Sequence, residues 1–141
     1  NDFIRVAEKV SGAELNWYLN DWVNTTNKID YAIKDVAEEN NATTATLERV
    51  GIMAMPLDVT VSYTDGTSEN IYIPLSMMQW EKPASEGMDR TVEKDWSWAQ
   101  RDYNLKLNKP KSDISKIEID AAGFMADVDR SNNVYPAEAA E

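Results

Sequence analysis

The chain has 141 residues, enough for one hydrophobic core, and its 43% hydrophobic and 28% charged content is typical of a folded domain. Its net charge of −11 disfavours nucleic acid and anionic lipid as partners, because a strongly acidic surface repels phosphate. The sequence lacks cysteine, which excludes disulfides and thiolate metal sites, and it lacks histidine, which excludes Ser-His-Asp catalysis, Cys-His catalysis and histidine-containing zinc sites.

The first residues predict two short amphipathic helices. Over residues 2–10, four apolar residues recur at helical spacing: Phe3, Val6, Ala7 and Val10. Ser11 and Glu14 have the spacing of a capping box, which predicts that Ser11 begins the second helix. The apolar face of that helix comprises Leu15, Tyr18, Leu19 and Trp22. Two threonines and an asparagine at residues 25–27 predict its end.

From residue 29 onward the apolar period changes to two, which predicts strands. We expect them over residues 29–34, 45–50, 57–64, 68–75 and 114–119. The polar residues 38–43 predict a turn, and Asp65-Gly66 predicts a two-residue hairpin turn because both residues tolerate a positive φ. Residues 80–95 predict a long loop. Trp96 and Trp98 are spaced to lie on the same face of a further strand.

Several short strands separated by turns, in about a hundred residues, predict an antiparallel β-sandwich of the immunoglobulin/fibronectin-like type, preceded by the two helices. We place the domain boundary between residues 1–27 and residues 28–141, with a loose C-terminal tail. No apolar run approaches the roughly 20 residues that a membrane-spanning helix needs. The abrupt start at Asn1, directly in a helical pattern, leads us to expect a segment of a longer polypeptide.

Ordered blocks across nearly the whole chain resemble a known family. The stretch FIRVAEKVSGAELNWYLNDWVNTT resembles the last helices of the thermolysin-like catalytic domain in aminopeptidase-N-like zinc metallopeptidases, the gluzincins. The matching residues are Phe3, Ser11, Gly12, Glu14, Leu15, Trp17, Tyr18 and Trp22. The blocks VTVSYTDGTSENIYIPL, EKDWSWAQRDY and KIEIDAAGFMADVDRSNN resemble the β-sandwich that follows in a bacterial subgroup. Asn27-Lys28-Ile29 departs from the family, where many members have Gly-x-Pro.

The resemblance implies a non-catalytic role. The His-Glu-x-x-His string that binds zinc in the family is absent from the sequence, so we carry over no catalytic, cofactor-binding or zinc-binding residue and expect no enzyme activity from this chain. Zinc would belong to the parent protein, a hydrolase for which the resemblance favours a periplasmic or secreted location. The implied partner is the catalytic domain of the same polypeptide. Its expected contacts are Trp17, Tyr18 and Trp22, which would otherwise favour self-association of the segment.

Two alternative interpretations remain open. A stand-alone β-sandwich could bind carbohydrate or protein through an aromatic surface made of Trp80, Trp96 and Trp98. The C-terminal loop also offers a weak calcium-binding pattern in EF-hand-like positions: Asp127, Asp129, Ser131, Asn133 and Glu138. Asn132 replaces the glycine of the loop, and Pro136 interrupts the helix that would follow. We therefore expect a polar turn without a bound metal.

Overall fold

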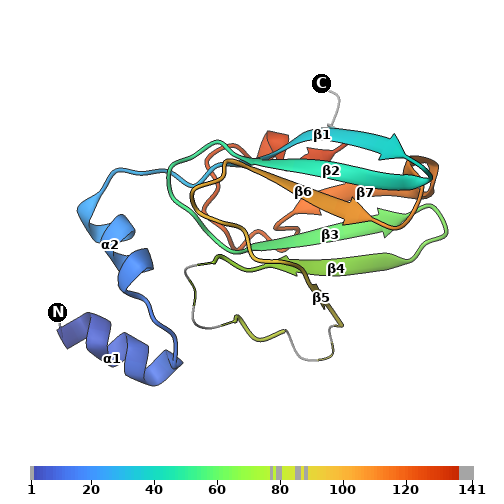
Figure 1. Cartoon of the computed structure of the whole chain (residues 1–141). Coiled ribbons are helices and arrows are strands. Elements are labelled where there is room, and N and C mark those ends of the chain that lie inside the picture. The colour runs from blue at the N-terminus through green and yellow to red at the C-terminus, as the bar shows by residue number, and fades with distance from the viewer. Residues whose placement is uncertain (1, 77, 79–80, 85–86, 88, 137–141) are drawn as a thin grey trace.

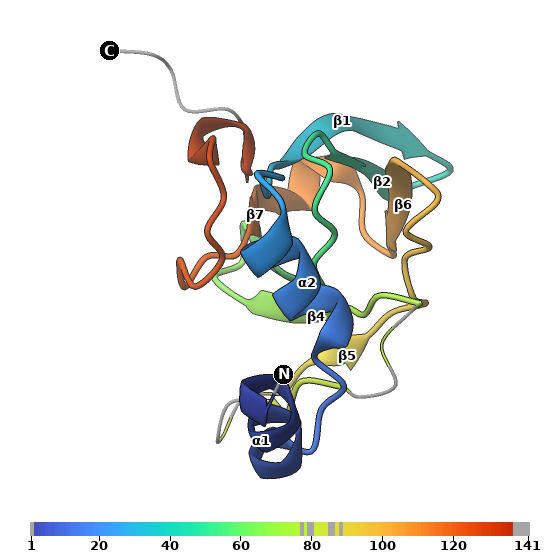
Figure 2. The ribbon, with the colours of Figure 1, turned by 90° about the vertical axis from the view of Figure 1, so that its left-hand side faces the viewer.

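Two helices precede the strands in the computed structural model, which describes residues 2–76, 78, 81–84, 87 and 89–136. Helix α1 spans Asp2–Ser11 and helix α2 spans Asn16–Asn24. Figure 1 shows both helices beyond one end of the strands. In Figure 2, which views the molecule from that end, α2 lies in front of the sheets and α1 lies farther out, on the side of β4 and β5.

The predicted capping box is wrong. Gly12 adopts a φ of +71° and donates its N–H to the Glu8 carbonyl at 2.8 Å, which ends α1 after Ser11 instead of before it. The Ser11 hydroxyl donates to the Ala7 carbonyl, so Ser11 belongs to the first helix. Helix α2 begins after Leu15, whose N–H donates to the Glu8 carboxylate at 3.0 Å.

The strands form two sheets. The three-stranded sheet has the order β1-β2-β6, with β1 at Tyr31–Glu39, β2 at Ala42–Arg49 and β6 at Asp102–Leu107. The five-stranded sheet has the order β5-β4-β3-β7-β8, with β3 at Leu57–Tyr63, β4 at Ser68–Ile73, β5 at Thr91–Val92, β7 at Ile114–Ile119 and β8 at Val134–Tyr135. Short 3-10 helices lie at Lys111–Asp113 and Arg130–Asn132. All strand pairs are antiparallel except β4 with β5, which is parallel. The chain is therefore mainly β, with two N-terminal helices.

Two turns differ from expectation. The polar turn between β1 and β2 is only two residues long, because Asn40 and Asn41 both adopt a positive φ and Glu39 pairs directly with Ala42. The two-residue turn predicted at Asp65-Gly66 is instead a three-residue loop, in which only Gly66 has a positive φ. The Asp65 carboxylate accepts the N–H and the hydroxyl of Thr67 and so stabilises the loop, and Asp65 itself does not adopt a positive φ.

The hydrophobic core lies between the two sheets. Its largest contribution comes from the inward faces of β3, β4, β6 and β7: Leu57, Val59, Val61, Tyr63, Ile71, Ile73, Leu105, Leu107, Ile114, Ile117 and Ile119. In β1 the predicted alternation holds only at the start of the strand. A register shift between Ile33 and Asp35 inserts one extra residue, so the buried face changes from odd-numbered to even-numbered residues. Tyr31 before the shift and Val36 after it are therefore both buried.

Candidate functional site at the helical end of the molecule

Helix α1 leaves its apolar face uncovered. Phe3 is 75% exposed, Val6 60% and Val10 83%, and none of the ten residues of α1 is buried. An amphipathic helix normally buries its apolar stripe against a partner, because the hydrophobic effect supplies most of the stability of a short helix. The sequence predicted this stripe, and the described part of the chain does not cover it.

Helix α2 carries three aromatic side chains in edge-to-face contact. The ring centroids of Trp17 and Tyr18 are 5.7 Å apart, and those of Tyr18 and Trp22 are 6.0 Å apart. Tyr18 packs against the margin of the core, whereas Trp22 is 47% exposed and the neighbouring Val23 is more exposed still. We call the exposed apolar residues of the two helices the helical-end surface: Phe3, Val6, Val10, Trp22 and Val23.

An apolar groove of about 180 Å³ lies between the start of α2 and the segments that precede β3 and follow β4. It is lined by Ala13, Glu14, Leu15, Trp17, Tyr18, Met55, Pro56, Met78 and Lys82. Met55 forms one wall of the groove, and the Tyr31 hydroxyl fixes its position. This hydroxyl accepts the Met55 N–H at 2.8 Å and donates to the Met55 carbonyl at 3.1 Å. The groove is therefore built on the core, and one of its walls is the aromatic face of α2.

More exposed apolar side chains lie at the same end of the three-stranded sheet. Tyr31 at the start of β1 pairs with Arg49 at the end of β2, and β6 also starts at this end. The loops that leave β2 and lead into β6 expose Ile52 and Trp98. They are joined by a hydrogen bond of 2.7 Å from the Arg49 guanidinium to the Trp98 carbonyl. The end of the sheets next to the helices thus presents apolar groups as well.

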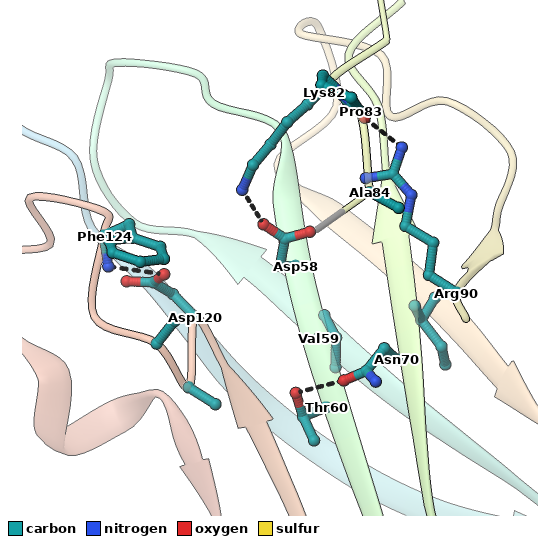
Figure 3. Close-up of a pocket in the computed structure, with 13 residues that line it drawn as sticks. Asp58, Val59, Thr60, Asn70, Lys82, Pro83, Ala84, Arg90, Asp120 and Phe124 are labelled. Atoms are coloured by element: carbon teal, nitrogen blue, oxygen red, sulfur yellow. Dashed lines mark hydrogen bonds and ion pairs between the residues drawn. The ribbon is translucent and has the colours of Figure 1, made fainter. Parts of the chain in front are cut away.

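A second hollow, with a cavity volume of about 90 Å³, lies on the outward face of β3 and β4 (Figure 3). Asp58, Thr60 and Asn70 lie on these strands. Lys82 and Arg90 stand on one side of the hollow, and the turn at residues 120–124 stands on the other. The sequence showed that polar residues alternate along residues 57–64, but the segments that wall the hollow come from elsewhere in the chain.

The predicted aromatic surface is wrong for Trp96. This residue is 2% exposed, and its ring centroid lies 5.5 Å from that of Tyr31 and 5.3 Å from that of Tyr103 in the core. Its indole N–H donates to the Gln100 carbonyl at 2.8 Å, so the chain turns back immediately after it. Trp98 lies in that turn and is exposed, so the two residues do not share a strand face. Trp80 lies outside the described residues.

The carboxylates of the C-terminal loop accept hydrogen bonds from the loop itself and from the start of β1. Asp127 accepts the N–H of Tyr31 at 3.0 Å and the N–H of Asp129 at 2.9 Å, and its Oδ2 also accepts from the Asn133 amide at 3.3 Å. The Asp129 carboxylate accepts the N–H and the hydroxyl of Ser131. Glu138 lies outside the described residues. Within the described ranges, no group of three or more acidic residues is positioned to hold a metal ion.

The buried acidic residue Asp120 is not indicated by any pattern in the sequence. Asp120 is buried at the end of β7, with a φ of +51°, and its carboxylate accepts the N–H groups of Phe124 and Met125 at 3.0 and 2.8 Å. The Arg130 guanidinium lies 3.1 Å from it. These partners are a local turn and a residue ten positions later, and no periodic pattern indicates such an arrangement.

None of the helices that the structure describes has the length and apolar character needed to cross a bilayer. A comparison with models of protein families, with characterised proteins and with solved structures finds no match to this chain.

Proposed function

We propose that this chain is a non-catalytic structural and interaction segment of a zinc aminopeptidase-like metallopeptidase. The helices would complete the catalytic domain, and the two sheets would form an immunoglobulin/fibronectin-like sandwich that buttresses that domain. The proposal rests on the resemblance of residues 3–26 to the last helices of such a domain and on the uncovered helical-end surface.

The observation that carries the proposal is the exposure of α1. An isolated helix of ten residues is marginal in water, because forming its first turn orders several residues for a single hydrogen bond. Full burial of each of Phe3, Val6 and Val10 would contribute about 1.5–3 kcal/mol. A partner that covers this face therefore stabilises α1 and gains affinity from the same contacts.

The chemistry of the partner follows from the surface. With a net charge of −11, the chain is repelled by anionic lipid and by nucleic acid. The exposed face of α1 and the exposed Trp22 favour an apolar protein surface. We assign Trp22 to this contact together with Trp17 and Tyr18, which a partner would reach through the groove that they line. In the absence of that surface, a second copy of the chain can cover the same face.

The first test is the coding sequence upstream of Asn1, which should contain His-Glu-x-x-His and a downstream glutamate. The second test is binding between that upstream domain and this chain, expressed separately and measured by calorimetry. Val6→Glu should weaken binding by about tenfold or more. Val92→Glu is the control, because Val92 is 46% exposed and lies on β5, away from the helices in Figure 1. It should leave the affinity unchanged.

Three results would contradict the proposal: no such motif upstream, equal effects of the two valine substitutions, or stoichiometric zinc with aminopeptidase activity in this chain alone. Self-association gives an independent readout. Trp22→Glu should shift any dimer towards monomer in sedimentation experiments without changing the thermal stability of the sheets, because Trp22 contributes little to their core.

A further inference from the structure

The edges of the two sheets are not equally covered. At the β1 edge, the Tyr31 N–H donates to the Asp127 carboxylate at 3.0 Å, and Lys111 Nζ donates to the Val36 carbonyl at 2.8 Å. The five-stranded sheet ends in β5 and β8, which have two residues each. At the other edge of the three-stranded sheet, β6 has six residues and pairs only with β2 among the described strands. β6 is therefore a long edge on which another strand can pair.

The outward backbone groups of β6 belong to Asp102, Asn104 and Lys106. The Arg49 N–H donates to the Arg101 carbonyl at 2.8 Å, so the backbone of Arg101 faces β2. Because the backbone groups of consecutive residues point to alternate sides of a strand, those of the three residues named first point away from β2. All three residues are exposed, and no described residue outside the β2 pairing hydrogen-bonds to their backbone.

The space beside this edge is open. A groove of about 660 Å³ follows β6 and is bounded on its other side by residues 93–95. The Tyr103 ring packs against the core, and its hydroxyl donates to the Lys94 carbonyl at 2.6 Å, so residues 93–95 pass on the inward side of β6. Figure 2 shows β6 on the opposite side of β2 from β1. An added strand would lie about 4.8 Å from β6, on the side of the groove.

The side chains along this edge complement those of an identical strand that runs the other way. In an antiparallel pair of β6 strands centred on Asn104, Asp102 of each copy lies opposite Lys106 of the other. The outward backbone groups lie at the same residues, so each opposed pair also exchanges backbone hydrogen bonds. In the registers centred on Tyr103 and Leu105, both charges instead lie opposite neutral residues. The charges therefore favour the register centred on Asn104.

Both charges are available for this contact. Lys106 forms no ion pair with any residue that the structure describes. Asp102 Oδ2 lies 2.9 Å from Lys34 Nζ of β1, and the Asp102 side chain is still 46% exposed. A lysine on an edge strand normally discourages pairing with another chain. An identical strand in this register removes that obstacle, because it brings a carboxylate to each lysine.

We propose that two copies of the chain associate through antiparallel pairing of β6, in the register centred on Asn104. The two three-stranded sheets then form one continuous sheet across a two-fold axis. The contact uses neither the helical-end surface nor the groove beside α2, so it does not depend on the proposed docking. The interface is small and each copy has a net charge of −11, so the dissociation constant should be on the order of a millimolar. The contact therefore adds nothing to self-association measured by sedimentation at micromolar concentration.

The first test is a concentration series of the ¹⁵N-labelled Trp22→Glu chain, followed by NMR from about 0.05 to about 2 mM. Trp22→Glu is used so that association through the helical-end surface does not contribute. The backbone amides of Asp102, Asn104 and Lys106 should shift with concentration. Their N–H groups should also exchange more slowly with solvent at the highest concentration, because the second copy accepts their hydrogen bonds. This test needs no substitution in β6.

Charge reversal in the same chain tests the register. Asp102→Lys and Lys106→Asp should each raise the dissociation constant by about tenfold or more, because like charges then lie directly opposite each other. Net charge alone predicts opposite effects, since Asp102→Lys makes the chain less acidic and Lys106→Asp makes it more acidic. An equimolar mixture of the two variants should regain association, because each then meets the opposite charge at both positions. It is followed with only one variant ¹⁵N-labelled.

Lys116→Asp is the matched control for Lys106→Asp. It makes the same change in net charge, and Lys116 lies on β7 in the other sheet with its side chain 41% exposed. It should change the dissociation constant by no more than about twofold. The spectra also report whether each variant is folded.

Three results would overturn the proposal. The first is that the amides of Asp102, Asn104 and Lys106 do not shift up to the highest concentration. The second is that the two charge reversals act in opposite directions. The third is that their mixture associates no more tightly than either variant alone, which would mean that β6 pairs in another register or with another segment.

Discussion

Replacing Tyr31 by phenylalanine tests how the groove beside α2 is tied to the core. Tyr31 is 1% exposed, and its hydroxyl forms both the 2.8 Å bond from the Met55 N–H and the 3.1 Å bond to the Met55 carbonyl. Tyr31→Phe keeps the edge-to-face contact with Trp96 but removes the partner of both backbone groups. Met55 lines the groove, so the effect should extend to the wall that faces Tyr18.

At neutral pH, the loss of stability in Tyr31→Phe comes from the Met55 N–H and carbonyl, which no longer have a hydrogen-bond partner. Leaving a buried donor or acceptor without a partner costs about 1–3 kcal/mol, and Met55 is only partly buried, which places the expected loss in the lower half of this range. For a chain of this length, each kcal/mol lowers the melting temperature by about 3–5 °C.

The same substitution should also change how the stability of the fold depends on pH. Burial raises the pKa of Tyr31 from 10.0 to about 12. Because the folded pKa lies above the unfolded one, the stabilising effect of the neutral phenol is fully present below pH 10. It is lost as the pH rises through about 12, and the loss is on the order of 3 kcal/mol. Tyr31→Phe should remove this part of the alkaline loss of stability. Desolvation also raises the pKa of Tyr103 and of Tyr63, so some loss remains.

The assay is urea denaturation near neutral pH and again above pH 10, for the wild type, Tyr31→Phe and Tyr135→Phe. Tyr135 is the matched control, because it is half-buried and no described residue hydrogen-bonds to its hydroxyl. It should lose no more than about 0.5 kcal/mol at neutral pH. The reasoning is refuted if the two variants are equally stable at neutral pH and the alkaline loss is the same in both as in the wild type.

Two further predictions concern the loops. Gly51→Ala should destabilise the chain by about 2 kcal/mol or more in urea denaturation, since the new Cβ would lie 2.3 Å from the Lys28 carbonyl oxygen. Gly66→Ala, in open space at a φ of +85°, should lower the free energy of unfolding by only about 1 kcal/mol. Equal losses in the two variants would contradict the close approach of Gly51 to the Lys28 backbone. Millimolar calcium should leave the melting temperature unchanged. Asp127→Ala should lower it without calcium, because the Tyr31 N–H loses its acceptor; a calcium-dependent rise abolished by Asp127→Ala would contradict this.

Local patterns in the sequence were sufficient for most of the elements. The helical spacing from Phe3 to Val10 and the alternation from Leu57 to Tyr63 both correspond to observed elements, because each pattern reports the geometry of its own segment. The two-sheet, mainly β class followed from the same periodicity. The absence of histidine and cysteine also restricts the chemistry of the chain without any knowledge of its fold.

Features that depend on distant residues were decided by the tertiary structure. The pairing of β2 with β6 brings together residues more than fifty positions apart, and the burial of Trp96 follows from its contact with Tyr31 on the other side of the core. The register shift at Lys34 and the walls of the hollow near Asp58 are of the same kind. A period of two or of 3.6 specifies which side of an element is apolar, but it contains no information on which segment covers that side. The packing of the whole chain decides which segment covers an apolar face. The apolar face of α1 is covered by no segment that the structure describes.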